Sequence, residues 1–270
     1  MIRASEDTAK KQHRWLRVAK KATLCLFIAC AIIIGVSYHV ARRFLGRHQP
    51  SAQQERIIAD RRNWLQNEHD ALPVIIPTPQ GHLAGLLCIR PHAQRVILGC
   101  HGYRRNKEDI WQLVEAFPKD TILLFDFRAH GQSSGTHTSI GLREADDVTN
   151  AVQFLKEQRL TKELPIVGIG LSMGAVALLG AAAQGTKFYA IIADSAYDNL
   201  DTQISRVFSK QSGLPNFPFL NICKQFFNRW HGAPLSAAYP QKWVNQSDIP
   251  KFFIHSELDN FTPYSCSQEL

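Results

Sequence analysis

The chain has 270 residues, of which 45% are hydrophobic; this excludes a disordered protein and allows one large domain or at most two modest ones. Its net charge of +8 would suit a nucleic-acid-binding protein if it were spread over the chain. Residues 1–62, however, hold thirteen Lys and Arg against four Asp and Glu, whereas the remainder holds eighteen against nineteen. The excess is N-terminal, where a membrane surface is the natural partner, so we predict no nucleic-acid binding.

A transmembrane anchor is predicted over residues 22–41, from Ala22 through Ala41, after a basic segment over residues 1–21. This run of twenty residues has no formal charge and as a helix would span roughly 30 Å, about one bilayer core. A buried core helix and a cleavable signal peptide are the alternatives. Seven Lys and Arg precede the run and five lie in the twenty residues after it. We therefore expect a single-pass membrane protein with a cytoplasmic N-terminus and an exported domain.

Residues 42–72 are predicted to link the anchor to the folded domain. Ile57, Ile58, Trp64 and Leu65 repeat at helical spacing within this stretch and indicate a short amphipathic helix. The six cysteines show no spacing typical of a metal or redox site, and neither a metal motif nor a nucleotide-binding motif appears. We therefore predict no cofactor and no metal.

From residue 73 to residue 270, short apolar runs alternate with longer amphipathic segments, which is typical of a mostly parallel sheet flanked by helices. The domain is therefore expected to be α/β. The predicted strands are residues 83–89, 95–100, 121–125, 166–170, 189–194 and 251–255. The predicted helices are residues 107–117, 142–157 and 173–184. Residues 196–247 interrupt the alternation with Phe, Trp, Pro and Asn, and are predicted to form a lid over the carboxyl ends of the strands.

The sharpest motif is GxSxG at residues 170–174, formed by Gly170, Leu171, Ser172, Met173 and Gly174. It follows an apolar strand and opens a helix of small residues, which is the context of a nucleophile elbow. Such a turn exposes the serine oxygen and needs glycines where a side chain would collide with neighbouring backbone. Ser172 is therefore the predicted nucleophile, whereas the alternative is a tight turn with an incidental serine.

With this motif in place, residues 74–263 resemble the α/β hydrolases, most closely the lysophospholipase and serine-aminopeptidase-like group. His101, Gly102 and Tyr103 are similar to the family's HGx segment, and the resemblance implies that the backbone amides of Tyr103 and Met173 form the oxyanion hole. Residues 125–135 are similar to the DxRGHGxS loop, with Ala129 in place of a glycine. His130 in that loop is expected to be structural rather than a catalytic base.

The resemblance assigns the acid of the catalytic triad to Asp259. Residues 251–263 are similar to the family's strand and HGxxDxxxP segment, with Ser256 in place of a glycine. The competing acid is Asp194, at the end of the preceding strand, where some related enzymes keep theirs. Otherwise Asp194 is a residue that caps a turn.

The family's order is serine, acid, histidine, and no histidine follows Asp259. His101, His231 and His255 all lie too early to match. The sequence is therefore expected to be truncated, to be degenerate, or to take its histidine from an unforeseen position. The 270-residue form is expected to leave the strand at 251–255 without an outer neighbour and to be nearly inert, because a serine hydroxyl needs a base.

Two functions remain open from the sequence. The first is a serine hydrolase that cleaves an ester, thioester or amide, with a small-molecule or lipid acyl substrate. Aromatic lid residues would then line an acyl pocket or only pack the lid, namely Phe217, Phe219, Phe226, Phe227 and Trp230. The second is a non-catalytic, membrane-tethered remnant or binding module with a hydrolase-like fold.

Overall fold

A seven-stranded sheet forms the centre of the computed structural model, which describes the backbone of residues 2–270 and the side chains of residues 14–270. The strand order is β1-β2-β4-β3-β5-β6-β7. The strands are β1 (Leu72–Thr78), β2 (Gly81–Cys88), β3 (Val96–Cys100), β4 (Thr121–Phe125), β5 (Ile166–Leu171), β6 (Ala190–Asp194) and β7 (Lys251–Ile254). From β4 to β7 every neighbouring pair is parallel, and β1 and β2 add an antiparallel edge. This confirms the predicted mostly parallel α/β architecture.

The six predicted strands all form, with boundaries that shift by one or two residues. β1 was not predicted, because Pro73 and Pro77 remove amide donors and obscure the apolar alternation. It is nevertheless compatible with these prolines, since an edge strand needs amides on one side only. β7 lies at the other edge, where Phe252 and Ile254 are 64% and 44% exposed.

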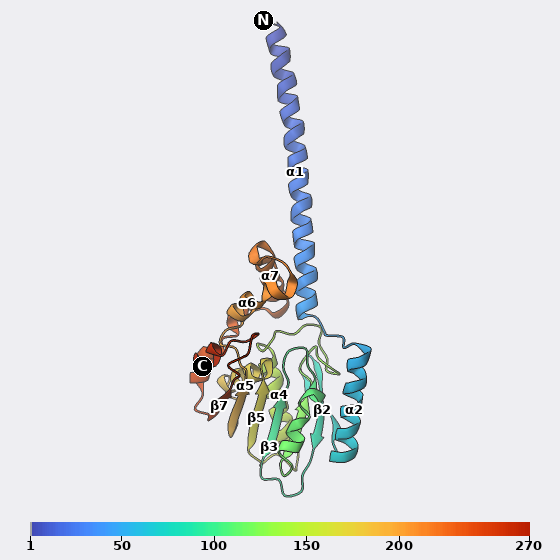
Figure 1. Cartoon of the computed structure of the whole chain (residues 1–270), viewed down its shortest axis with the longest axis vertical. Coiled ribbons are helices and arrows are strands. Elements are labelled where there is room, and N and C mark those ends of the chain that lie inside the picture. Colours follow the sequence, from blue (N-terminus) through green and yellow to red (C-terminus); the bar gives the residue numbers. More distant parts are fainter. Residues whose placement is uncertain (1) are drawn as a thin grey trace.

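The longest helix is α1 (Ile2–Leu45), which projects away from the sheet (Figure 1). Its segment Arg14–Leu45 is long and apolar enough to cross a membrane. The helix runs beyond the predicted span at both ends, and the side chains of residues 1–13, most of the predicted basic segment, lie outside the described residues. The linker helix is α2 (Ala52–His69), which begins at a Ser51 capping box and buries Leu65.

The predicted helix at 107–117 is wrong as a single element. A 3₁₀ turn, η1 (Lys107–Ile110), is followed by the short α3 (Gln112–Ala116). The Lys107 side chain turns inward to the buried carboxylate of Asp126, and Asp109 caps the turn by accepting from the Asn106 amide. The segment predicted as one helix therefore begins with a buried ion pair and a 3₁₀ turn instead of a regular α-helical turn.

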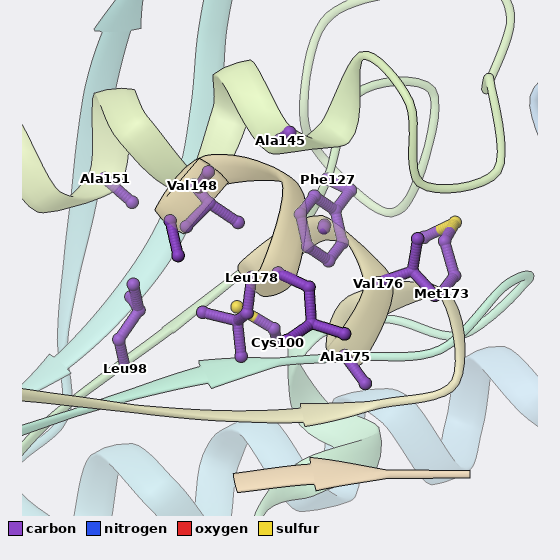
Figure 2. Close-up of a cluster of buried hydrophobic side chains, with 14 of the residues drawn as sticks. Leu98, Cys100, Phe127, Ala145, Val148, Ala151, Met173, Ala175, Val176 and Leu178 are labelled. Atoms are coloured by element: carbon purple, nitrogen blue, oxygen red, sulfur yellow. The ribbon is translucent and has the colours of Figure 1, made fainter. Parts of the chain in front are cut away.

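Two long helices cover one region of the sheet core. They are α4 (Glu144–Glu157) and α5 (Met173–Ala183), close to the predicted spans. Figure 2 shows α5 with its small side chains between the sheet and α4. Ten of the eleven residues of α5 are buried, which explains its lack of polar residues. The small side chains let this helix approach β3 and β5 closely, and that approach fixes the position of Ser172 at its start.

The predicted lid, residues 196–247, consists of short helices, chiefly α6 (Leu200–Ser212) and α7 (Asn221–His231). The shorter elements are η2 (Asn216–Leu220), η3 (Leu235–Ala237), α8 (Pro240–Trp243) and η4 (Val244–Gln246), and the final helix is α9 (Ser265–Gln268). α7 packs beside the lower end of α1 (Figure 1), where Tyr38 makes edge contacts with Phe226 and Trp230. The membrane-type helix and the lid therefore form one packed unit.

Candidate active site

Ser172 lies in the sharp turn between β5 and α5, as the motif predicts. Its φ of 51° and ψ of −113° are values that residues with a Cβ rarely adopt. The amide of Ser172 donates to the Asp194 carbonyl at 2.7 Å, and its carbonyl accepts from Val176 at 3.1 Å. Such a conformation costs about 1–3 kcal/mol and persists only where the surroundings hold it. Strain at this one serine is what a nucleophile elbow requires.

Two glycines allow this turn by the close approach of backbone to backbone. A Cβ on Gly170 would lie 2.5 Å from the Ala175 nitrogen, and a Cβ on Gly174 would lie 2.2 Å from the Cys100 carbonyl oxygen. Real Cβ atoms do not approach backbone so closely, so both positions require glycine. The first and last residues of the motif therefore have the steric role that the sequence predicts.

The segment from His101 to Tyr103 passes next to Ser172. A Cβ placed on Gly102 would lie 3.8 Å from the Ser172 Cβ. Met173 is the first residue of α5, where an amide has no acceptor within its own helix. The hydrogen bonds of the described residues outside helices and strands include none donated by the Tyr103 amide. The two amides predicted for the oxyanion hole thus belong to segments that adjoin Ser172.

His101 holds this segment in place as a neutral imidazole. Its Nδ1 donates to the Gly102 carbonyl at 2.8 Å, and its Nε2 accepts from the Phe127 amide at 3.1 Å. Complete burial, with a smaller contribution from His130, lowers the pKa of His101 to about 3. Protonation would cost the Phe127 hydrogen bond, because a protonated ring has no acceptor.

Acidification is therefore expected to destabilise the protein through His101. Its pKa is lower in the folded chain than in the unfolded chain, so unfolding takes up a proton and stability falls as the pH drops from about 6.5 toward 3. Between pH 7 and pH 5 the loss from this group is about 2 kcal/mol. Urea unfolding at pH 7 and pH 5 should show this loss of stability. The variant His101→Gln, whose side chain cannot take up a proton, should lose less stability over the same range. An equal pH dependence in both proteins would exclude His101 as a source.

His130 is structural, as expected from the sequence. Its Nδ1 lies 2.8 Å from the Arg128 carbonyl and its Nε2 accepts from the Arg104 amide at 3.2 Å, so both ring nitrogens have backbone partners. Burial lowers its pKa. Among the described residues, no hydrogen bond joins either nitrogen to Ser172.

A cavity of about 370 Å³ opens above Ser172. Its polar lining residues include His48, Gln54, Arg104 and Arg105, and also Gln203 and Gln211 of α6. Its apolar lining residues come mainly from three separate segments, namely Phe44 at the end of α1, Ile140, and the α6 residues Leu200, Ile204 and Val207. The lid therefore forms a wall of the candidate site, and the end of α1 contributes to it as well.

Asp259 lies in the loop after β7. Its Oδ1 accepts from the amides of Phe261 and Thr262 at 2.8 and 2.9 Å, and its Oδ2 lies 3.8 Å from Nε2 of His255. The His255 ring is already engaged by the Thr262 carbonyl and the Ser267 hydroxyl. Phe261, two residues on, lines the Ser172 cavity, whereas Asp259 does not. Its role as the triad acid stays a prediction.

Asp194 lies at the end of β6, paired with Leu171, the residue before Ser172. Its carboxylate accepts from the Ser195 hydroxyl at 2.8 Å, and its carbonyl holds the Ser172 amide. Its backbone thus supports the elbow directly. The assignment of Asp194 as the alternative acid also stays a prediction.

The last turn of α1 contacts the same segment that holds the predicted oxyanion amides, which the sequence reasoning missed. The Tyr103 hydroxyl donates to the Phe44 carbonyl, and the Arg104 guanidinium donates to the Arg43 carbonyl. These carbonyls lie at the helix end, where backbone acceptors lack partners. Arg47 then donates to the carbonyls of Gly131 and Gly135 at 2.9 and 3.0 Å. Phe44 and Leu45 directly after Arg42 and Arg43 were the signal that the helix continues into the domain.

Residues 97–263 match the model of the family described as "Alpha/beta hydrolase family". The chain belongs to the α/β hydrolase family. Among curated relatives, the uncharacterized protein YqkD of Bacillus subtilis is 33% identical over 204 residues, which are 73% of this chain and 66% of YqkD. The uncharacterized protein YfhR of Escherichia coli K12 is 23% identical over 267 residues, which are 97% of this chain and 82% of YfhR.

Solved structures of this family support the same fold. The esterase Pf2001 of Pyrococcus furiosus superposes with a TM-score of 0.61 at 25% identity, covering 77% of this chain and 79% of the esterase. Est1E of Butyrivibrio proteoclasticus, solved with ferulic acid bound, superposes with a TM-score of 0.56 at 18% identity over 72% of this chain and 83% of Est1E, and shows the fold alone. Together with the family match, these neighbours support a hydrolase.

Proposed function

We propose that this chain is a serine hydrolase that cleaves an ester, thioester or amide through an acyl-enzyme on Ser172. The observation that supports it most is the strained Ser172 backbone at the mouth of a cavity, between two glycines that no other residue could replace. In this mechanism Oγ of Ser172 attacks the substrate carbonyl carbon, its proton passes to a base, and the amides of Tyr103 and Met173 stabilise the oxyanion. Water then hydrolyses the acyl-enzyme.

The rate depends on the base. His48 lines the Ser172 cavity, and burial, Arg104 and His130 lower its pKa, which keeps its imidazole neutral at pH 7. Among the described residues, however, no imidazole donates to or accepts from the Ser172 hydroxyl. We therefore expect slow acylation, at roughly the 10³–10⁴ acceleration that binding and an oxyanion hole sustain without a base. In the proposed mechanism Asp259, or alternatively Asp194, orients the base.

A fluorophosphonate probe tests this function, because it reacts with activated serines. The full chain, held in lipid nanodiscs, is incubated with the probe and digested, and the labelled peptide is identified by mass spectrometry. We expect slow labelling on Ser172 that disappears in Ser172→Ala and persists in the control Ser256→Ala, an exposed serine. Labelling that survives Ser172→Ala would contradict the assignment. Complete absence of labelling over many hours would favour the non-catalytic binding module, which the lack of a base contact also supports.

We further propose that α1 anchors the hydrolase domain to a membrane, with the N-terminus cytoplasmic and the domain exported. The length and apolar character of Arg14–Leu45, and the seven Lys and Arg that precede residue 22 against five in the twenty residues after residue 41, support this arrangement. Alkaline phosphatase fused to the C-terminus should be active, because it folds only after export. An inactive fusion with a fluorescent cytoplasmic reporter at the same site would reverse the topology.

A further inference from the structure

We propose that the acyl chain of the substrate lies along the last turns of α1, in an apolar channel between α1 and the lid helices α6 and α7. The substrate is then an ester or thioester of a medium or long fatty acid. This inference rests on the proposed function of Ser172 and specifies its substrate class. In this arrangement the anchor helix is one wall of the binding site as well as a tether.

The channel begins next to the cavity that contains Ser172. A second pocket, of about 40 Å³, lies between α1, α6 and α7. Four of its lining residues also line the Ser172 cavity, namely Phe44, Ile140, Ile204 and Val207. In the proposed arrangement, an acyl group whose carbonyl lies at Ser172 passes between these four apolar side chains to reach the second pocket.

The second pocket has the chemistry of a hydrocarbon site. Lys224 is its only charged lining residue, and the others are aliphatic, aromatic or the buried thiol of Cys223. Its α1 residues are Val40, Ala41, Phe44 and Leu45, whose spacing places them on one face of the helix. Burial of each methylene there contributes about 0.8 kcal/mol of transfer free energy, whereas a polar group would lose its hydration.

The direction of the channel leads toward the proposed membrane. Val40 and Phe44 are one helical turn apart in the lining of this pocket, and toward its N-terminus α1 projects away from the sheet (Figure 1). Cys223, which also lines the pocket, donates to the Ser37 carbonyl at 3.3 Å, and nearer the N-terminus of α1 apolar side chains such as Ile32 and Phe27 are exposed. A chain that leaves the channel in this direction meets the layer in which α1 itself would lie.

The Ser172 cavity also has polar lining residues that suit a polar leaving group. Gln54, Arg104 and Arg105 are among them, and among the described residues the buried Nε of Arg104 has no hydrogen-bond partner. A substrate with a polar end and an apolar chain thus fits the chemistry of the two pockets. Because the second pocket is small, a long acyl chain must also move α6 and α7 away from α1. These two lid helices lie outside the central sheet, so the sheet can stay in place when they move.

Alkyl fluorophosphonates of two lengths test the channel in the full chain in nanodiscs. We expect the dodecyl probe to label Ser172 at least about tenfold faster than the ethyl probe, because its methylenes are buried. Val207→Phe, which fills the junction of the two cavities, should slow the dodecyl probe at least about tenfold and the ethyl probe less than about twofold. Equal rates for the two probes, or equal slowing of both by Val207→Phe, would overturn the inference while the proposed function stands.

A matched pair of variants controls for stability. Val207 and Val152 are both 7% exposed, and Val152 lies on α4 and lines neither cavity. Val207→Ala widens the junction and should raise the dodecyl-to-ethyl ratio at least about twofold, whereas Val152→Ala should leave it unchanged. This pair decides the question if Val207→Phe does not fold. Equal ratios in the two alanine variants would count against the channel.

A binding measurement separates the channel from the chemistry. The fluorescent fatty acid 11-dansylaminoundecanoic acid should bind Ser172→Ala in nanodiscs above the background of empty nanodiscs, and Val207→Phe in that background should weaken binding at least about tenfold. If the fatty acid binds but neither fluorophosphonate probe labels the wild-type chain, the proposed function is wrong and the channel stands. If Val207→Phe leaves fatty-acid binding unchanged, the channel is wrong.

Discussion

Alanine in place of Gly174 is expected to destabilise the protein by at least about 3 kcal/mol and to abolish labelling of Ser172. The added Cβ would meet the Cys100 carbonyl oxygen at 2.2 Å and the His101 carbonyl oxygen at 2.7 Å. Both are backbone atoms of the central strand β3 and the segment after it, so neither can rotate away. Relief requires α5 to separate from β3, and that motion carries Ser172 away from Tyr103. Urea unfolding followed by tryptophan fluorescence measures the first effect and fluorophosphonate labelling the second.

Gly35→Ala is the matched control, because an alanine there, within α1, would meet no atom within 4 Å. It should change the stability by less than about 1 kcal/mol, and it removes a residue of poor helix propensity. The description of the elbow would be wrong if the free energy of unfolding of Gly174→Ala lay within about 1 kcal/mol of the wild-type value and Ser172 were labelled at the wild-type rate. A loss of labelling without a loss of stability would instead locate the effect in the geometry of Ser172.

The sheet and the elbow were predictable because each depends on local sequence. Buried parallel strands are continuous apolar runs, and the runs at β3, β4 and β5 stand out between polar segments. Gly170 and Gly174 are separated by the spacing that one tight turn requires, so the turn at Ser172 could be predicted before its neighbours were known. The same holds for His130, whose position in a loop rich in small polar residues favoured local hydrogen bonds.

What the sequence did not reveal depends on distant partners. Nothing near Lys107 indicates that its ammonium lies against Asp126, nineteen residues later, and the predicted helix failed there for that reason. The end of α1 was assigned to a linker, because the contacts of Phe44 with Tyr103 and with the lid come from residues far along the chain. The cavity walls could not be predicted either, since they combine three separate segments.

Removal of the Lys107 ammonium is expected to cost about 3–5 kcal/mol, because it leaves a buried carboxylate unpaired. Nζ of Lys107 lies 2.7 Å from Oδ2 of Asp126 and 3.1 Å from Oε1 of Gln132, and the Lys107 and Asp126 side chains are almost completely buried. Burial alone would raise the pKa of Asp126, but the ammonium and amide hydrogen bonds hold it below its usual value. Lys107→Met removes that support, and the pKa should then rise.

This shift gives the prediction a pH signature. In the wild type the lowered pKa of Asp126 stabilises the protein above the unfolded pKa of about 3.9, and the benefit is lost as the pH falls. In Lys107→Met the folded protein holds the proton more tightly than the unfolded chain, so its stability falls as the pH rises. The free energy of unfolding of Lys107→Met, measured in urea, should therefore fall further below the wild-type value at pH 7.5 than at pH 5.

Two further variants separate the buried charge from the loss of a lysine. Lys107→Met combined with Asp126→Asn should be more stable than Lys107→Met alone, because the amide oxygen still accepts one of the backbone hydrogen bonds and the unpaired charge of Asp126 is removed, while Glu108 keeps its ion pair with Arg62. Lys162→Met removes an exposed lysine beside Glu163 and should cost less than about 1 kcal/mol. If Lys107→Met lost no more than Lys162→Met, the 2.7 Å contact would not be a buried ion pair, and the loop that carries His130 would need another support.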